Sequence, residues 1–532
     1  MQLDEFLHHL HFDTDKVRPV DLVVDWADAP LPYKLYQDLP VTSLSAEVPV
    51  SLHAVRSQES SVGIEEIGGF LWYSYGLTQL CHTLFPLGEG EKAANVMQML
   101  RRYVPSGGAL YPSELYAYLK LEGLAPGIYH YDVAHHRLVC LREGNFDRYL
   151  ARALGHRCDM TSCFGALFVS TMFWKNFYKY NNFAYRLQGL DAGALIGQLL
   201  EVAKQCGYAA FVDFQFLDRA INHLLGLCDE EESVYAVVPL ALADSGGFIG
   251  QADLQGTSGI ESADVLCREL AELPHKHYVK SKKITGYPLL IKMNEAAMMH
   301  STQAFTYMPK AQQETGYTAG PIVNLPNEVQ SSDWDFIDLC RQRYSPGLDF
   351  IPGGVGLAEL SALLAGATSS CGYGDDLALA NETCAPRLAM AGCVHGVDGL
   401  EDGAYIYDHR AHGLRLLRAG DHRMHLQLGM SMPTVNLFQA PLCLHVVGCR
   451  DFYRTRFGYR GYRIQQMEVG MLLQRLLLAA AALGMGGHPL LGYDEGVCDD
   501  IYDFGQQGRT CLIQVPMGFY RKTSRFEGLL WG

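Results

Sequence analysis

The sequence lacks the marks of an exported, membrane-spanning or nucleic-acid-binding protein. Basic residues are few: 42 Lys and Arg stand against 58 Asp and Glu, which gives a formal net charge of −16. A surface of that sign repels a polyphosphate backbone, so nucleic acid is excluded as a general partner. The opening residues, MQLDEFLHHLHFD, are acidic and have no pattern of an export signal. We therefore expect a cytoplasmic protein.

Long apolar runs and cysteine motifs are also missing. The most apolar stretch, residues 467–485, is interrupted by Glu468, Gln474 and Arg475, and it falls short of the ~20 apolar residues that a membrane span needs. This pattern predicts a buried helix and no membrane partner. The 15 cysteines include no CxxC pair, so we expect free, buried thiols and no metal site.

The chain contains two copies of one domain. Residues 127–144, GIYHYDVAHHRLVCLREG, align with residues 403–420, GAYIYDHRAHGLRLLRAG, at an offset of 276 and with nine identical positions. Residues 185–207 align with residues 462–484 at an offset of 277. Such a constant offset indicates a duplicated domain and not a short solenoid repeat.

Each copy combines paired strands with a long helix. The first pair of segments has the pattern of strand, turn and strand, and the second pair has helical periodicity. The helix of the second copy is apolar on almost every side, which favours complete burial. We predict an α+β fold in which the copies form an intramolecular pseudo-dimer around buried central helices. The expected boundaries are an N-terminal extension (1–55), a first domain (56–245), a linker with some helix (246–330) and a second domain (331–532).

The first copy carries a glycine-rich loop and, farther along, a pair of residues able to move a proton. Glycine has no Cβ, so the backbone amides of such a loop can approach a planar ring closely. On the residues alone, an ordinary turn and a surface lysine beside a packing tyrosine are the alternatives. The loop consists of Pro105, Ser106, Gly107 and Gly108, and the pair is Lys179 and Tyr180.

The second copy carries a different motif, with two arginines and a serine near its start. Arg341, Arg343 and Ser345 offer two forked cations and a hydroxyl, a set suited to a phosphate monoester. Gly492, in GGHPLLGYDE, could present a backbone amide, and Arg521 could add charge near the phosphate. The alternatives here are a solvated helix end, a plain turn and a solvated tail.

This set of motifs resembles the SagB/McbC-type azoline dehydrogenases, a branch of the FMN-dependent nitroreductase superfamily. The resemblance covers roughly residues 56–245 and 331–525 and implies tandem nitroreductase-like domains with FMN as the cofactor. It implies that Arg341, Arg343 and Ser345 bind the phosphate, that Gly492 faces the flavin N5, and that the Pro-Ser-Gly-Gly loop meets the ring. Lys179 and Tyr180 would be the catalytic residues.

Each copy lacks what the other retains. At an offset of 276, the glycine-rich loop aligns with Asn381-Glu382-Thr383-Cys384, and at 277 the Lys-Tyr pair aligns with Arg456-Phe457. Aligning Gly76 with Gly366 gives an offset of 290 and places Ser51 and His53 opposite the two arginines, with Arg56 nearby. Because the resembled proteins bind each FMN between two protomers, the retained parts imply one FMN site per chain and a second, inactive one.

The resemblance also implies a reaction. Its substrate would be an azoline-containing precursor peptide whose thiazoline or oxazoline becomes a thiazole or oxazole, with a cyclodehydratase complex as partner. The ring C–H is weakly acidic and needs a positioned base, a role that Lys179 beside Tyr180 can fill, while FMN supplies the redox chemistry. Two other functions stay open: an NAD(P)H-dependent nitro- or quinone reductase, and a non-catalytic scaffold in a peptide-modifying complex.

Overall fold

The chain divides into two compact units. The computed structural model describes residues 1–19, 21–47, 62–85, 95–243, 259–308, 321–326, 335–368, 374–378, 387–522 and 527–529. The first-copy unit consists of Val23–Ile291, Met298–Phe305 and Thr523–Gly532, and the second-copy unit consists of Met1–Leu22, Lys292–Ala297 and Thr306–Lys522. The segment 246–330 thus contributes to both units.

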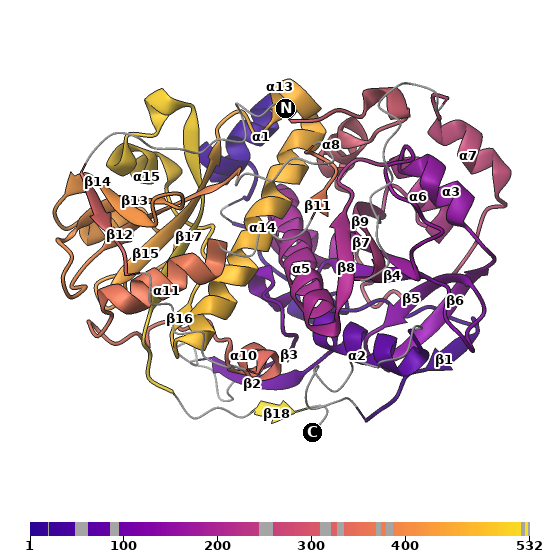
Figure 1. The fold of residues 1–532 in the computed structure, drawn as a ribbon, viewed down its shortest axis with the longest axis horizontal. Coiled ribbons are helices and arrows are strands. Elements are labelled where there is room, and N and C mark those ends of the chain that lie inside the picture. Colours follow the sequence, from indigo (N-terminus) through magenta and orange to yellow (C-terminus); the bar gives the residue numbers. More distant parts are fainter. Residues whose placement is uncertain are drawn as a thin grey trace. The chain divides into compact units, whose positions relative to one another are not determined.

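The first-copy unit is built on an antiparallel sheet in the order β1-β6-β5-β4-β7-β9-β8, with helices around it (Figure 1). The strands are β1 (Val41–Ser43), β4 (Ser113–Leu119), β5 (Gly127–Asp132), β6 (Arg137–Glu143), β7 (Gly165–Met172), β8 (Tyr208–Val212) and β9 (Glu232–Leu242). The helices are α2 (Ile64–Tyr75), α3 (Asp147–Ala153), α4 (Trp174–Tyr180), α5 (Ala184–Cys206), α6 (Asp218–Leu225) and α7 (Ala263–Glu269); α8 (Pro288–Ala297) is divided between the units.

The second-copy unit has a sheet in the order β10-β14-β13-β12-β15-β17-β16. Its strands are β10 (Ile322–Asn324), β12 (Ala389–Val394), β13 (Gly403–Asp408), β14 (Gly413–Ala419), β15 (Leu442–Cys449), β16 (Gly486–Gly487) and β17 (Arg509–Gly518), with the short β11 (Gly374–Asp375). Its helices are α1 (Leu3–Phe12), α10 (Phe336–Gln342), α11 (Leu357–Thr368), α12 (Arg423–Leu428), α13 (Arg454–Phe457), α14 (Tyr459–Ala482) and α15 (Glu495–Tyr502).

The two sheets share one topology, which confirms that the fold is α+β and built twice. Each strand of the first order has a counterpart at the same place in the second. Even the irregularities repeat: the ladder shifts between Ile128 and Tyr129 in one unit and between Ala404 and Tyr405 in the other. A bulge kept at the same offset of 276 shows that the backbone register was inherited with the sequence.

The starts of two equivalent helices correct one alignment. Gly63 donates its amide to Glu66 at the start of α2, at 3.0 Å, and Gly356 does the same to Glu359 at the start of α11, at 3.1 Å. These capping boxes are 293 residues apart, so the offset of 290 taken from Gly76 and Gly366 is wrong. Glycine occurs at several places in or after helices, whereas a capping box marks the first turn of a helix and therefore aligns the two helices reliably.

The long helices α5 and α14 are the buried elements that the repeat predicts. Most of their residues have almost no exposed surface, and α5 ends at Gly207 with a positive φ of 73°. The buried surface of α14 also includes polar side chains, among them those of Arg460, Arg463 and Glu468. Within the described part of the chain, no helix combines the length and apolar character needed to span a bilayer.

The ends of the chain join the unit of the opposite copy. The N-terminal helix α1 belongs to the second-copy unit, where Asp4 accepts hydrogen bonds from Arg454 at 2.6 Å and from Tyr459 at 2.7 Å. The C-terminal strand β18 (Glu527–Leu529) belongs to the first-copy unit and pairs with β2 (Gln79–Phe85), which pairs in turn with β3 (Asn95–Arg101).

We predict that Gly461→Ala destabilises the protein by about 1–3 kcal/mol, measured by thermal or denaturant unfolding, because a small core site is overfilled. A Cβ at Gly461 would lie 2.6 Å from the carbonyl carbon and oxygen of Tyr453, which are backbone atoms and cannot turn away. The first copy has Ala184 at the equivalent position, and Ala184→Gly should cost at most about 1 kcal/mol of helix propensity. A stable Gly461→Ala variant would contradict the close approach.

Candidate active site

The Pro-Ser-Gly-Gly loop is a tight turn between β3 and β4. Ser106 is extended, and the short turn η4 (Gly107–Ala109) follows it. Gly108, Ala109 and Tyr111 have φ values of 64°, 57° and 48°. Glycine adopts such values freely, but a residue with a Cβ pays about 1–3 kcal/mol. The loop therefore keeps a strained conformation at two non-glycine residues.

Asp191, on α5, holds this loop by both carboxylate oxygens. The Ser106 hydroxyl donates to Oδ2 at 2.6 Å, and the Gly107 amide donates to Oδ1 at 3.1 Å. The Ser106 oxygen in turn accepts the Tyr111 amide at 2.9 Å. Burial raises the pKa of Asp191 to about 7, although both donors favour the ionised form.

The Lys-Tyr pair lies beside the same loop. Lys179 and Tyr180 are the last residues of α4. A Cβ added at Gly108 would lie 2.5 Å from the Tyr180 hydroxyl oxygen and 2.6 Å from Lys179 Nζ, so these polar atoms use the space that the glycine leaves. The Lys179 amine also lies 5.3 Å from the ring centre of Trp26, a cation–π distance. The structure thus brings the two motifs of the first copy together.

A buried ion pair fixes α4 to the strand that follows the loop. Lys175, one turn before Lys179, pairs with Glu114 on β4, and His130 Nε2 lies 2.9 Å from the other Glu114 oxygen. Burial would raise the pKa of Glu114, but Lys175 and His130 together lower it below its usual value. Breaking such a buried pair costs about 3–5 kcal/mol, so the end of α4 is held firmly.

The phosphate motif of the second-copy unit begins where α10 ends. Arg341 is in the last turn of the helix, Arg343 follows at its C-terminal cap, and Ser345 comes two residues later. The Arg341 side chain is 47% exposed and lies 3.9 Å from Asp338. An exposed pair at that distance is weak, so a phosphate can compete for the Arg341 guanidinium.

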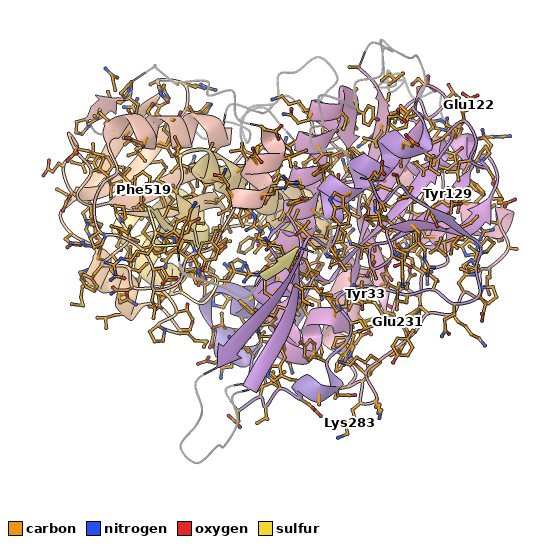
Figure 2. All side chains as sticks on the ribbon, turned by 90° about the horizontal axis from the view of Figure 1, so that it is seen from below. Tyr33, Glu122, Tyr129, Glu231, Lys283 and Phe519 are labelled. Atoms are coloured by element: carbon orange, nitrogen blue, oxygen red, sulfur yellow. The ribbon has the colours of Figure 1, made fainter. Side chains whose placement is uncertain are left out.

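The segment with Arg521 lies against this motif. The Arg521 amide donates to the carbonyl oxygen of Asp349 at 2.9 Å, and the Ile351 amide donates to that of Phe519, which is labelled in Figure 2, also at 2.9 Å. The rings of Tyr344 and Tyr520 are 5.0 Å apart. Arg521 is exposed, and its segment lies beside the segment that follows Arg341 and Arg343.

Gly492 lies on the loop between β16 and α15. Its carbonyl accepts the Ser431 amide at 2.9 Å, and a Cβ at this glycine would lie 3.2 Å from the Ser431 hydroxyl oxygen. Gly347 approaches the same neighbouring segment, since a Cβ there would lie 3.3 Å from the Thr434 carbonyl oxygen. The Gly492 loop and the chain after Ser345 therefore contact one common stretch, residues 431–434.

The second-copy unit satisfies its helix carboxylate in a different way. The residue equivalent to Asp191, at an offset of 277, is Glu468 on α14. Glu468 pairs with Arg387, which also pairs with Asp375, and all three side chains are buried. Several residues compared in the sequence lie outside the described residues: Ser51, His53, Arg56, Asn381, Glu382, Thr383 and Cys384.

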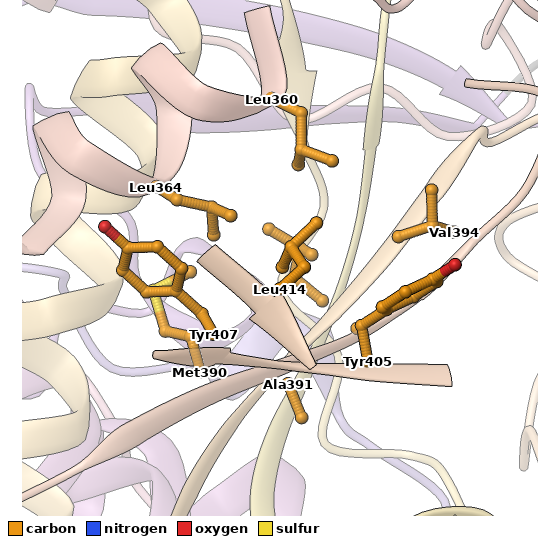
Figure 3. Close-up of a pocket in the computed structure, with 10 residues that line it drawn as sticks. Leu360, Leu364, Met390, Ala391, Val394, Tyr405, Tyr407 and Leu414 are labelled. Carbon is orange, nitrogen blue, oxygen red and sulfur yellow. The ribbon is translucent and has the colours of Figure 1, made fainter. Parts of the chain in front are cut away.

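Two hollows in the structure are weaker candidates for a cofactor site. The second-copy unit contains an apolar cavity of about 10 Å³ beside α11, lined by Leu360, Leu364 and Tyr405 among others (Figure 3), and this volume holds one water at most. The first-copy unit has a groove of about 740 Å³ near α3 and α7. Three of its charged residues already pair with one another, because Arg152 binds Glu261 at 2.9 Å and also binds Glu269.

Trp26 and Asp191 are the residues of this region that the motifs did not identify. Trp26 lies in the segment expected as an N-terminal extension, and nothing in the surrounding sequence indicates its contact with Lys179. Asp191 lies within the duplicated helix, where the second copy also has an acid. An acid kept at one position of both copies was the signal that could have found it.

Comparisons with known proteins agree with the fold. Residues 426–519 match the nitroreductase family. A crystal structure of a proposed nitroreductase from Anabaena variabilis ATCC 29413 has a TM-score of 0.71 and 21% identity, over 98% of this chain and 99% of that one. This chain has the nitroreductase fold. The family match implies a flavin-dependent oxidoreductase.

A second comparison bears on the branch. The trifolitoxin-processing protein TfxB of Rhizobium leguminosarum bv. trifolii is 28% identical over 137 residues, which are 24% of this chain and 36% of TfxB. The match therefore spans about a third of that relative. A chain of the Escherichia coli microcin synthetase McbBCD complex is 19% identical over 39% of this chain and 68% of its own, with a TM-score of 0.27. The similarity to TfxB, together with the nitroreductase fold, confirms the expected resemblance to SagB/McbC-type proteins.

We predict that Gly108→Ala is more damaging than Gly123→Ala. Both glycines have a positive φ, 64° and 78°, so both variants carry a similar backbone strain of about 1 kcal/mol or more. A Cβ at Gly123 meets nothing within 4 Å, whereas a Cβ at Gly108 meets Lys179 and Tyr180. Unfolding experiments should show an extra loss of about 1 kcal/mol for Gly108→Ala. Equal losses would mean that the space beside Gly108 is not restricted.

Proposed function

We propose that this chain is an FMN-dependent dehydrogenase that converts thiazolines or oxazolines of a ribosomal precursor peptide to thiazoles or oxazoles. The observation that carries the proposal is the position of Lys179 and Tyr180 beside Gly108 in the Pro-Ser-Gly-Gly loop. A possible base thus adjoins the loop that is proposed to face the flavin ring. The similarity to TfxB, which by its name processes trifolitoxin, supports a peptide as the substrate.

The residues present suit FMN. Arg341, Arg343 and Ser345, with Arg521 nearby, would hold the phosphate through charge-assisted hydrogen bonds. Pro105, Ser106, Gly107 and Gly108 would meet the ring, and Gly492 would offer its amide. When bound, FMN supplies the acceptor for the hydride that leaves the substrate ring.

The chain's own residues would handle the proton. Oxidation of an azoline removes one C–H proton and one hydride, and the double bond so formed completes the aromatic ring. The neutral amine of Lys179 or the phenolate of Tyr180 would take the proton, since both side chains reach the space beside Gly108. Trp26 and Tyr180, whose ring centres lie 5.3 Å and 4.9 Å from the Lys179 amine, hold it in place.

We propose one FMN per chain because each copy retains a different part of the site. The second copy has Arg456 and Phe457 in place of the Lys-Tyr pair. Its helix acid, Glu468, pairs with Arg387, whereas Asp191 at the equivalent position of the first copy binds a serine hydroxyl and a glycine amide. In the second copy, an ion pair thus replaces the contact between the helix acid and a cofactor loop, and the burial of such a pair has a desolvation cost. This difference supports an inactive second site.

Two other functions make different experimental predictions. A nitro- or quinone reductase would be reduced rapidly by NADPH and not by an azoline peptide. A non-catalytic scaffold would be purified without flavin. A cyclodehydratase complex as partner rests on the resemblance and would be tested by co-purification with the precursor peptide present.

We predict that the purified chain releases one equivalent of FMN on heating, and that Arg341→Ala and Arg343→Ala weaken FMN binding. Each variant removes a charge-assisted phosphate contact of about 1.5–3 kcal/mol, or roughly 10-fold to 100-fold in Kd. Fluorescence titration of the apo-protein measures the change. Arg56→Ala is the matched control and should bind FMN as the wild type does. Two equivalents of FMN, or a loss confined to Arg56→Ala, would contradict the assignment.

We predict that Lys179→Ala and Tyr180→Phe keep FMN but lose azoline oxidation by about 10² to 10⁴ in rate, which is the usual cost of a missing base. Turnover of a thiazoline peptide and flavin absorbance are measured together. Arg456→Ala and Phe457→Leu alter the equivalent positions of the second copy and should retain turnover. Equal losses in both sets would mean that these segments only support the fold.

A further inference from the structure

The carboxylate of Asp191 is a buried group of the first-copy unit to which the proposed chemistry gives no role. It lies on α5, outside the motif, and accepts one hydrogen bond from the Ser106 hydroxyl and one from the Gly107 amide. The Ser106 hydroxyl has a single proton, which it gives to Asp191, and its oxygen accepts the Tyr111 amide. Asp191 thus holds the first two residues of the turn, and the Ser106 hydroxyl oxygen links them to Tyr111.

We propose that Asp191 is a positioning residue that holds the Pro-Ser-Gly-Gly loop in the shape that receives the flavin ring. This assignment rests on the proposed function, in which the loop faces FMN. It adds a residue that touches neither cofactor nor substrate and acts through Ser106 and Gly107.

The strain in the loop is the reason that such a residue is needed. Ala109 and Tyr111 have φ values of 57° and 48°, and each would relax to a common conformation if nothing opposed it. The Ala109 amide donates to the Ser106 carbonyl at 3.0 Å, so the turn closes on Ser106 itself. Fixing Ser106 from α5 therefore fixes Gly108, and with it the space that Lys179 and Tyr180 occupy.

The ionisation of Asp191 provides a measurement that needs no cofactor. Burial raises its pKa from 3.8 to about 7. A carboxyl whose folded-state pKa exceeds its unfolded value stabilises the fold below the unfolded pKa, and this contribution is lost as the pH rises through about 7. Among the titratable groups of this unit, Tyr75 on α2 interacts with Asp191, which helps to raise the pKa of Tyr75. Lys179 and Tyr180 lie beside Gly108 of the loop that Asp191 holds.

The test compares apo-protein variants by FMN titration at a pH above 7. Ser106→Ala and Asp191→Asn should each weaken FMN binding about 10-fold, the usual effect of losing a hydrogen bond to a charged group. The double variant should be no weaker than the worse single variant, because both remove one connection. Ser106→Thr keeps the hydroxyl on an extended residue and should restore wild-type binding.

Asp191→Asn also tests the ionisation. Between pH 4 and pH 8, its unfolding temperature should rise relative to that of the wild type, because asparagine does not ionise. Glu468→Gln is the control in the second copy: it should cost stability, since Arg387 loses a charged partner, but it should leave the FMN Kd unchanged.

Several results would overturn the assignment. They are additive losses in the double variant, failure of Ser106→Thr to restore binding, or an Asp191→Asn variant with wild-type FMN affinity. If the wild type binds FMN and the variants behave as expected but no azoline peptide is oxidised, only the proposed reaction fails. If the wild type binds no FMN, both proposals fail.

Discussion

A carboxylate on a buried helix needs hydrogen-bond donors or a counter-charge, and in each unit this requirement determines what packs against the acidic residue of the long helix. In the first-copy unit the carboxylate is Asp191, and its donors come from a strained loop. In the second-copy unit the carboxylate is Glu468, and the Arg387 guanidinium pairs with one of its oxygens. The equivalent position of the long helix thus holds a backbone turn in one unit and forms an ion pair in the other.

The two copies keep the same backbone structure but differ in the residues proposed to bind the cofactor. Strand order, ladder irregularities and helix caps recur in both units. These features depend mainly on backbone hydrogen bonds, which form with most side chains. The hydrogen bond between a strand tyrosine and a turn histidine also recurs, at 2.8 Å for Tyr131 with His136 and for Tyr407 with His412. Residues that touch no repeated backbone contact were free to diverge, and the proposed cofactor residues are among them.

The sequence predicted what depends on local pattern. Identical residues such as Gly127 and Gly403 revealed the repeat, and helical periodicity revealed α5 and α14. The proximity of Gly108 to the Lys-Tyr pair needed the fold, since the two lie about 70 residues apart in the chain and only strand pairing closes that distance. Trp26 has no local signal, because its contact with Lys179 is set by the path of an irregular segment. The roles of Arg341, Arg343 and Gly492 stay predictions, since they concern a ligand and not the backbone.

The exchanged ends have a consequence for synthesis. Asp4 meets its partners Arg454 and Tyr459 only after some 450 further residues have been made, and β2 gains its neighbour only when Glu527–Leu529 has left the ribosome. The first-copy unit must therefore wait, partly assembled, for the segment that contains Glu527–Leu529, whereas α1 must wait for the rest of the unit that it joins. A nascent chain in that state exposes an unpaired strand edge. Two separately produced copies would each lack a segment of their own unit.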